Sequence, residues 1–205
     1  MPSYKLHYFN ARGRAEPARL AFAAAGIEYE DKRFEGREEW LRVKPELDPP
    51  FGQVPLLVID DKIKLAQSMA ILAYVAREGG LAPTNSLDIA MCDMIVGVEG
   101  DLNSKGMKWF MEKDEKKKVL KLREELDTTH IPAFLEAMSK FLEKNGTGFL
   151  VTDKLTYADI LVFNVCDNAP AEVLKKCPKM KEFHELIAAI PGIKAWLEKR
   201  PKTSM

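Results

Sequence analysis

The first part of the chain alternates strand-like segments with one helical segment. Residues 4–9 alternate between apolar and polar positions around Leu6 in the way of a half-buried strand, and residues 10–14 break that pattern. Residues 15–25 are rich in alanine and leucine, carry a proline in the first turn and stop before a glycine, which predicts a helix. Residues 29–34 alternate again. We therefore expect a strand, helix, strand unit, right-handed if its two strands are parallel.

A second group of strand-like segments follows a stretch without clear periodicity. Residues 35–53 are rich in charge and proline, and we expect them to be irregular. Residues 55–59 have the pattern of a buried strand, and residues 63–65 that of its hairpin partner after an Asp-Asp-Lys turn. Residues 68–77 have a helical pattern and end near two glycines. This order of elements predicts a thioredoxin-like α/β domain over residues 1–79.

Beyond a linker that ends at Asn85, the strand signals stop and apolar residues recur at helical spacing. A charged segment from Glu112 to Lys144 predicts a further helix, kinked at Pro132. The segment Thr156-Tyr-Ala-Asp159 has the form of a capping box that opens an apolar helix. We therefore expect an all-helical domain over residues 86–205, so the fold class is α/β followed by all-α.

The charge balance disfavours one class of partner. The 205 residues contain 31 Lys plus Arg and 31 Asp plus Glu, so no net field exists to hold a nucleic-acid backbone or an anionic membrane. The chain shows neither an apolar signal core nor an apolar run of membrane-spanning length, and we expect a cytoplasmic protein. The three cysteines and three histidines lack metal-ligand spacing, so neither a metal site nor a disulfide framework is predicted.

The loop after the first strand contains no cysteine, and this bears on the chemistry. A thioredoxin-like domain that performs its own redox chemistry places a cysteine at the start of the following helix, where the helix dipole lowers the thiol pKa. Here the hydroxyl of Tyr8, at the end of the strand, is expected to face that position instead. The domain is therefore suited to a thiol that its ligand supplies, which points to glutathione.

Four motifs, in the same order as in a known family, carry a resemblance over essentially the whole chain. They are Tyr-Phe-Asn-Ala-Arg-Gly-Arg-Ala-Glu at 8–16, Gly-Gln-Val-Pro at 52–55, Gln-Ser at 67–68 and Thr-Tyr-Ala-Asp at 156–159. With them the chain resembles a sigma-class glutathione S-transferase, the group of hematopoietic-type prostaglandin D synthases and cephalopod enzymes. The resemblance implies glutathione as co-substrate, a homodimer and a role in detoxification.

The resemblance also implies roles for individual residues. Tyr8 is expected to donate a hydrogen bond to the glutathione sulfur, which favours the thiolate. The bond before Pro55 is expected to be cis, with the backbone of Val54 pairing with the cysteinyl part of glutathione. Asp101 of the partner subunit is expected to reach the glutathione amine. The residues expected to bind glutathione are Arg14, Trp40, Lys44, Gln53, Val54, Pro55, Gln67, Ser68 and Asp101.

The leading hypothesis for function is conjugation of the glutathione thiolate to small hydrophobic electrophiles. Their pocket is expected to involve Phe9, Arg12, Asn103 and Met107. Two alternatives remain open: a glutathione-dependent prostaglandin D isomerase, which would use the same thiolate in a shaped pocket, and a non-catalytic ligand-binding or crystallin-like relative. Retention of Tyr8 and the other motif residues favours an enzyme.

Overall fold

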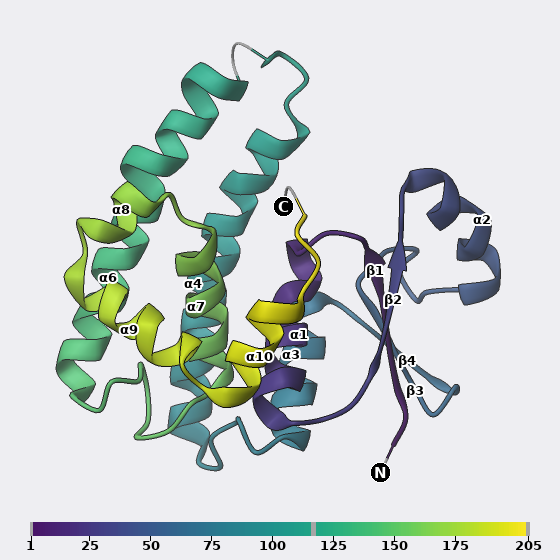
Figure 1. The fold of residues 1–205 in the computed structure, drawn as a ribbon, viewed down its shortest axis with the longest axis horizontal. Coiled ribbons are helices and arrows are strands. Elements are labelled where there is room, and N and C mark those ends of the chain that lie inside the picture. The colour runs from purple at the N-terminus through teal and green to yellow at the C-terminus, as the bar shows by residue number, and fades with distance from the viewer. Residues whose placement is uncertain (1, 116–117, 204–205) are drawn as a thin grey trace. The chain divides into compact units, whose positions relative to one another are not determined.

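The structure is a computed structural model that describes residues 2–115 and 118–203, without the side chains of residues 118–120. The chain forms two compact units (Figure 1). Unit 1 contains the residues up to Ala82 and the segment from Ile190 onward, and unit 2 consists of Pro83–Ala189.

Unit 1 is built on a four-stranded sheet in the order β2-β1-β3-β4. The strands are β1 (Tyr4–Phe9), β2 (Glu30–Phe34), β3 (Leu56–Ile59) and β4 (Ile63–Ala66). β1 runs parallel to β2 and antiparallel to β3, and β3 runs antiparallel to β4. The parallel pair confirms the predicted strand, helix, strand unit. Its register places Tyr8 opposite Arg33 near the carboxyl ends of β1 and β2.

Helices cover both faces of this sheet. Unit 1 contains the short 3-10 turn η1 (Gly13–Ala15), α1 (Glu16–Ala25), α2 (Arg37–Leu47), α3 (Ser68–Glu78) and α10 (Pro191–Lys199). α1 and α3 lie on one side of the sheet and α2 on the other (Figure 1). Leu6 of β1, Leu57 of β3, Phe22 of α1 and Leu72 of α3 are fully buried, so the core of unit 1 lies between the sheet and the α1–α3 layer.

Helix α2 corrects the sequence analysis, because residues 37–47 were expected to be irregular and are helical. Trp40 is the one buried residue of this helix, and Pro45 lies inside it, so the segment carries no apolar stripe that would signal a helix. Glu38 and Glu39 lie in the first turn, where negative charge favours helix formation.

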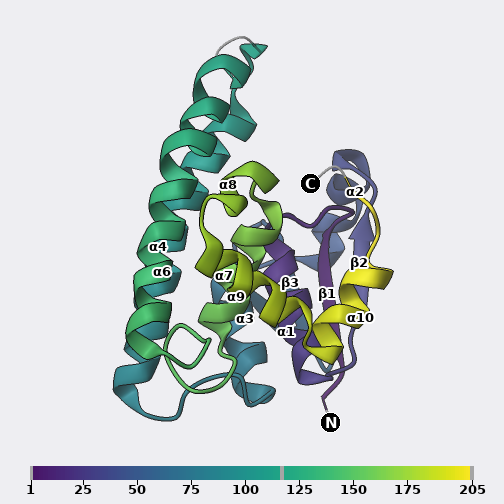
Figure 2. The ribbon, with the colours of Figure 1, turned by 60° about the vertical axis from the view of Figure 1, so that its left-hand side comes forward.

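All the regular elements among the described residues of unit 2 are helices, which confirms the predicted α/β plus all-α fold class. Its elements are α4 (Ser86–Met111), the short π-helical segments η2 (Lys118–Arg123) and η3 (Leu126–His130), α6 (Ile131–Asn145), α7 (Tyr157–Asn168), α8 (Ala171–Lys175) and α9 (Pro178–Ala188). α7 is buried along most of its length and packs against both α4 and α9 (Figure 2).

The single helix predicted over residues 112–144 is wrong at its start. α4 ends at Met111, the backbone of Glu112 is extended, and residues 112–114 are not helical. Residues 116–117 of that prediction lie outside the described part of the chain. Residues 118–145 are helical without a break, with η2 and η3 running into α6, so Pro132 in the first turn of α6 lies inside this helical stretch, as expected.

The predicted capping box at the start of α7 is confirmed. The Asp159 carboxylate accepts hydrogen bonds from the backbone N–H of Thr156 at 2.8 Å and of Leu150 at 2.8 Å. It also accepts one from the Thr156 hydroxyl at 2.7 Å. Burial raises the pKa of this carboxyl to about 6, although the hydrogen bonds act in the opposite direction. Asp159 therefore serves the helix start and the loop before it.

The last helix packs with the first domain. The sequence predicts one helical domain over residues 86–205, and in the structure the segment from Ile190 onward groups with unit 1. The reason is local: Gly192 brings α10 so close to α1 that a Cβ there would meet the carbonyl of Ala23. This contact joins residues far apart in the sequence, and no helical pattern announces it.

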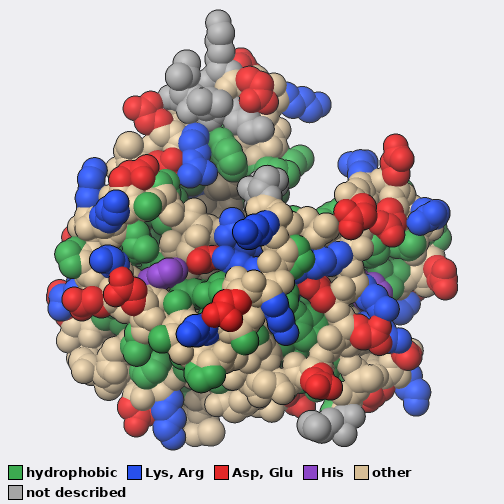
Figure 3. Space-filling view, in the orientation of Figure 1, with side chains coloured by type: hydrophobic (Ala, Val, Ile, Leu, Met, Phe, Trp, Pro, Cys, Tyr) green, Lys and Arg blue, Asp and Glu red, His purple; other side chains and the backbone are tan. Residues whose placement is uncertain are grey.

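Charges of both signs are interspersed over the face that Figure 3 shows, in agreement with the equal totals of 31 basic and 31 acidic residues. Among the described residues, none of the helices combines the length and the apolar character that a membrane crossing requires.

Candidate active site

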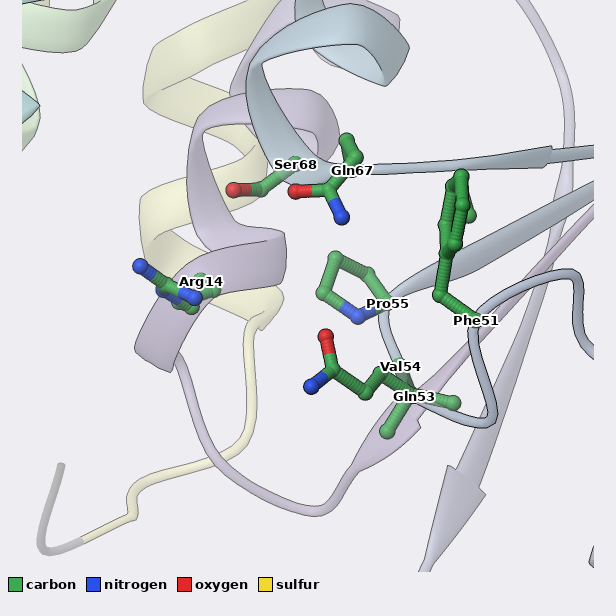
Figure 4. A pocket seen from close by; sticks show the side chains of 8 residues that line it. Arg14, Phe51, Gln53, Val54, Pro55, Gln67 and Ser68 are labelled. Atoms are coloured by element: carbon green, nitrogen blue, oxygen red, sulfur yellow. The ribbon is translucent and has the colours of Figure 1, made fainter.

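A pocket in unit 1 brings together residues from three of the four motifs. It lies beside the amino-terminal end of α3 and the beginning of β3 (Figure 4). Six predicted glutathione-binding residues line it, together with two that the sequence analysis did not single out. The lining residues are Arg14, Phe51, Gln53, Val54, Pro55, Ala66, Gln67 and Ser68.

Backbone geometry shapes this pocket on two sides. The Val54–Pro55 peptide bond is cis, as predicted. Gln67, which precedes α3, has a positive φ of 74°. Figure 4 shows the side chains of Gln53, Gln67 and Ser68 directed toward the space beside Pro55. These residues come from a loop, a turn and a helix start, so the pocket depends on the fold of the whole sheet region.

The start of α3 is suited to an anion. The side chain of Gln67 does not cap the helix, and its first turn carries no acidic residue. The backbone N–H groups of a first helical turn lack partners within the helix, and the helix dipole is positive at that end. The exposed Arg14 side chain adds a positive charge to the lining of the same pocket. This arrangement fits a carboxylate of a small ligand.

Tyr8 is linked to this pocket through the backbone of the loop that follows β1. The N–H of Arg14 donates a hydrogen bond of 3.2 Å to the Tyr8 hydroxyl oxygen. Gly13 has a φ of 42°, and a Cβ built on it would lie 2.7 Å from that oxygen. The hydroxyl oxygen thus accepts a hydrogen bond from the main chain, and its own hydrogen is available to a further acceptor. Gly13 belongs to the motif that carries the resemblance, but the sequence alone gave it no role.

Trp40 and Lys44 lie on α2, outside the pocket lining. Trp40 is only 8% exposed and its ring lies 5.4 Å from that of Phe34, so it is a packing residue of this helix. The Lys44 ammonium lies 5.7 Å from the Trp40 ring centroid. A Cβ on Gly52 would lie 3.1 Å from the same ammonium, which places this charge beside the loop that leads into the pocket.

Comparison with known proteins decides the family. The model of the glutathione S-transferase N-terminal domain matches residues 4–77, and that of the glutathione S-transferase C-terminal domain matches residues 100–200. The chain belongs to the glutathione S-transferase family. The prediction of a glutathione transferase with glutathione as its co-substrate is thereby confirmed.

Individual relatives of this transferase cover the full length of both chains. Hematopoietic prostaglandin D synthase from Gallus gallus is 38% identical over 100% of each chain, and S-crystallin SL11 from Nototodarus sloanii is 36% identical over 100% of each. A monomeric glutathione S-transferase from the hookworm Necator americanus superposes with a TM-score of 0.85 at 34% identity, covering 99% of this chain and 100% of the other.

The remaining predicted residues of the transferase lie in different places. Asp101 is on α4 in unit 2 and its side chain is exposed. Of the residues expected near the electrophile, Phe9 and Arg12 belong to unit 1, and Asn103 and Met107 to unit 2. The role of Asp101 requires a second subunit, and it stays a prediction.

Two of the described cysteines, Cys92 and Cys166, are buried and do not offer a reactive thiolate. Burial raises the pKa of Cys92 to about 11 and that of Cys166 to about 12, so both thiols are protonated at neutral pH. Cys177 is half-buried, and its sulfur lies 3.1 Å from the Ser139 hydroxyl. Across residues 2–115 and 118–203, no group of three His, Cys, Asp or Glu is placed to hold a metal ion.

Proposed function

We propose that Tyr8 activates glutathione by donating a hydrogen bond to its sulfur. A free thiol has a pKa of about 8.5 and is only a few per cent thiolate at neutral pH. A donor that is bonded to the charged form lowers this pKa, and each unit corresponds to about 1.4 kcal/mol. The observation that carries the proposal is the hydrogen bond from the Arg14 N–H to the Tyr8 oxygen, because it directs the hydroxyl hydrogen elsewhere.

The pocket beside Tyr8 is our candidate for the rest of glutathione. The γ-glutamyl carboxylate binds the first-turn amides of α3 and the side chains of Gln67 and Ser68. The backbone of Val54 pairs with the cysteinyl part, and the charge of Arg14 strengthens the positive field at the sulfur. Further predicted contacts are those of Gln53, of Trp40 and Lys44 at the glycyl end, and of Asp101 from the partner subunit.

The reaction follows from the thiolate. Its sulfur attacks an electrophilic carbon of a small hydrophobic compound, a carbon–sulfur bond forms, and in an aryl halide the halide leaves with the bonding electron pair. The thiol proton is released before the attack, so the protein needs only to stabilise the anion. This chemistry fits a detoxification enzyme.

We further assign the chain to the sigma class, as a cytoplasmic homodimer with a glutathione-binding domain at 1–79 and a helical domain at 86–205, of which the segment from Ile190 onward groups with unit 1. The motif around Tyr8 and the relatives named above support the class. The hookworm relative is described as monomeric, so the dimer is the part of the assignment to measure first, by light scattering or sedimentation.

The test of the Tyr8 assignment is conjugation of glutathione to chlorodinitrobenzene. Tyr8→Phe removes the hydrogen-bond donor and keeps the ring. We expect kcat/KM, measured at a pH below the thiol pKa, to fall by about tenfold to a hundredfold. Tyr4→Phe, a change to a buried tyrosine of the same strand, serves as the control and is expected to keep the activity. Full activity of Tyr8→Phe would refute the assignment.

A second candidate function is prostaglandin D isomerisation, because the Gallus gallus relative is a prostaglandin D synthase. The isomerase would use the same thiolate, and the S-crystallin relative represents the non-catalytic alternative. Product analysis with prostaglandin H2 separates these outcomes. Dominant formation of prostaglandin D2 would favour the isomerase, and binding of glutathione without turnover of either substrate would favour the crystallin-like alternative.

A further inference from the structure

A fully buried pair of opposite charges lies at the start of α1, directly behind the loop that carries the Arg14 amide. Arg19 and Glu16 are both 0% exposed, and Arg19 Nη1 lies 3.3 Å from Glu16 Oε2. Arg19 Nε is also paired with Asp31 of β2 at 3.2 Å. Charged side chains are almost never buried in this way unless they are paired.

Arg19 connects this cluster to Tyr8 in two ways. Its Nη1 donates hydrogen bonds to the carbonyls of Ala11 at 2.7 Å and of Arg12 at 3.3 Å. These two residues lead directly into Gly13 and the amide that bonds the Tyr8 hydroxyl. The Arg19 guanidinium carbon also lies 5.9 Å from the centroid of the Tyr8 ring. A shift of Arg19 would therefore move the loop that orients the hydroxyl.

Glu16 connects the same cluster to the last helix. Its second carboxylate oxygen, Oε1, accepts a hydrogen bond from the Trp196 indole N–H at 2.8 Å and one from Arg200 at 3.1 Å. At the other end of α10, Gly192 lies against the Ala23 backbone of α1. α10 is thus fastened along α1, and one carboxylate divides its two oxygens between Arg19 and α10.

The cost of this cluster points to a role in positioning. Arg19 Nη2 is buried and has no hydrogen-bond partner among the described residues. Buried ion pairs are often no more stable than well-packed apolar side chains, and an unsatisfied buried donor adds a further cost. This cluster contacts two loop carbonyls, the face of the Tyr8 ring and helix α10. It therefore fixes their relative positions, which apolar side chains in its place would not do.

We infer that α10 positions the Tyr8 hydroxyl through Glu16 and Arg19, so that Trp196 and Arg200 are positioning residues for thiolate stabilisation. The inference rests on the proposed role of Tyr8. Neither residue touches the sulfur. Each holds the carboxylate that holds Arg19, and loosening it lets the Arg14 amide move away from the tyrosine oxygen.

The test is a double-mutant cycle on the full-length chain. Trp196→Phe removes the indole N–H and keeps an aromatic ring, and Arg200→Gln removes the charge at the end of α10. For each variant, measured at a pH below the thiol pKa, we expect kcat/KM for chlorodinitrobenzene to fall by at least about threefold. We also expect the apparent pKa of the glutathione thiol to rise and KM for glutathione to stay unchanged. Arg200→Lys is expected to restore part of the activity. Glu198→Gln, an exposed charge loss on the same helix, is the control.

The same changes are then made in the Tyr8→Phe background. If α10 acts through Tyr8, Trp196→Phe has no further effect on the thiol pKa there, whereas a merely structural change gives the same loss in both backgrounds. Equal losses, or an unchanged thiol pKa in both α10 variants, would overturn the inference. If Tyr8→Phe by itself leaves the thiol pKa unchanged, the proposed function fails and not the α10 link alone. Thermal unfolding shows which variants fold. If Trp196→Phe does not fold, the same comparison is made with Arg200→Gln.

Discussion

The backbone N–H of Arg14 donates a 3.2 Å hydrogen bond to the hydroxyl oxygen of Tyr8. An amide that occupies a lone pair of this oxygen both fixes the position of the hydroxyl and polarises its O–H bond, so the hydrogen is a better donor to an anion. The catalytic property assigned to Tyr8 therefore depends on the loop that follows β1 as well as on the tyrosine itself.

The first prediction concerns Gly13 in that loop. Gly13→Ala places a Cβ 2.7 Å from the Tyr8 hydroxyl oxygen and 2.9 Å from its ring, so the ring or the loop must move. We expect conjugation to fall by about tenfold to a hundredfold, since a displacement of an ångström in a reacting group has effects of this size. Steady-state kinetics with chlorodinitrobenzene measures it.

Gly26→Ala is the matched control for Gly13→Ala. Gly26 also has a positive φ, 65°, but a Cβ there meets nothing within 4 Å. Both variants carry the strain of a left-handed alanine, about 1–2 kcal/mol, and are expected to unfold at lower temperature. Only Gly13→Ala is expected to lose activity. Equal activity losses would mean that backbone strain, and not contact with Tyr8, is responsible.

The second prediction concerns the close approach of α10 to α1. Gly192→Ala forces a Cβ against the Ala23 carbonyl, and we expect the free energy of unfolding to fall by about 1–3 kcal/mol. Gly97→Ala, in the interior of α4, adds a Cβ that meets nothing within 4 Å and is expected to raise it by about 1 kcal/mol. Urea unfolding at one chain concentration compares them, and a Gly192→Ala chain as stable as wild type would contradict the packing described.

The third prediction concerns the pH dependence of stability. Burial raises the pKa of Asp159 to about 6 from 3.8, so between these values the folded chain keeps a proton that the unfolded chain has released. The contribution of this group to the free energy of unfolding is therefore present at low pH and is lost as pH rises through about 6. Asp159→Asn should be less stable by about 1–3 kcal/mol, because one acceptor is lost, and should not show this dependence.

Urea unfolding at several pH values checks this prediction for Asp159. The difference in stability between wild type and Asp159→Asn is expected to shrink as the pH rises from 4 to 6, in the range set by the two pKa values. The exposed Asp153→Asn is the control and should follow the wild type at every pH. A difference that grows with pH would show that the hydrogen bonds outweigh burial.

Much of the fold was predictable because its signals are local. The alternation around Leu6, the glycine after α1 and the capping box at Asp159 each depend on neighbouring residues, and each predicted its element correctly. α2 was missed, because the single buried Trp40 leaves no apolar periodicity. The start of the helix expected at Glu112 was misplaced, because residues 112–114 carry the same charged pattern as the helical segment after them.

The candidate site was predictable only in part. The pocket collects Arg14, Gln53 and Ser68 as the motifs imply. The roles of Gly13 and Arg19 were not visible, because they depend on distances to Tyr8 that no spacing encodes. The contact between Glu16 and Trp196 joins residues 180 positions apart, and only the folded chain places them together.

The most direct test of the central claim is the pKa of the glutathione thiol when it is bound to the protein. The ultraviolet absorbance of the thiolate, followed over a pH titration, gives this value for wild type and for Tyr8→Phe. The account predicts a bound thiol pKa at least about one unit below that of the free thiol in wild type, and a value close to the free thiol in the variant. A Tyr8→Phe protein that binds glutathione and keeps the lowered pKa would contradict it.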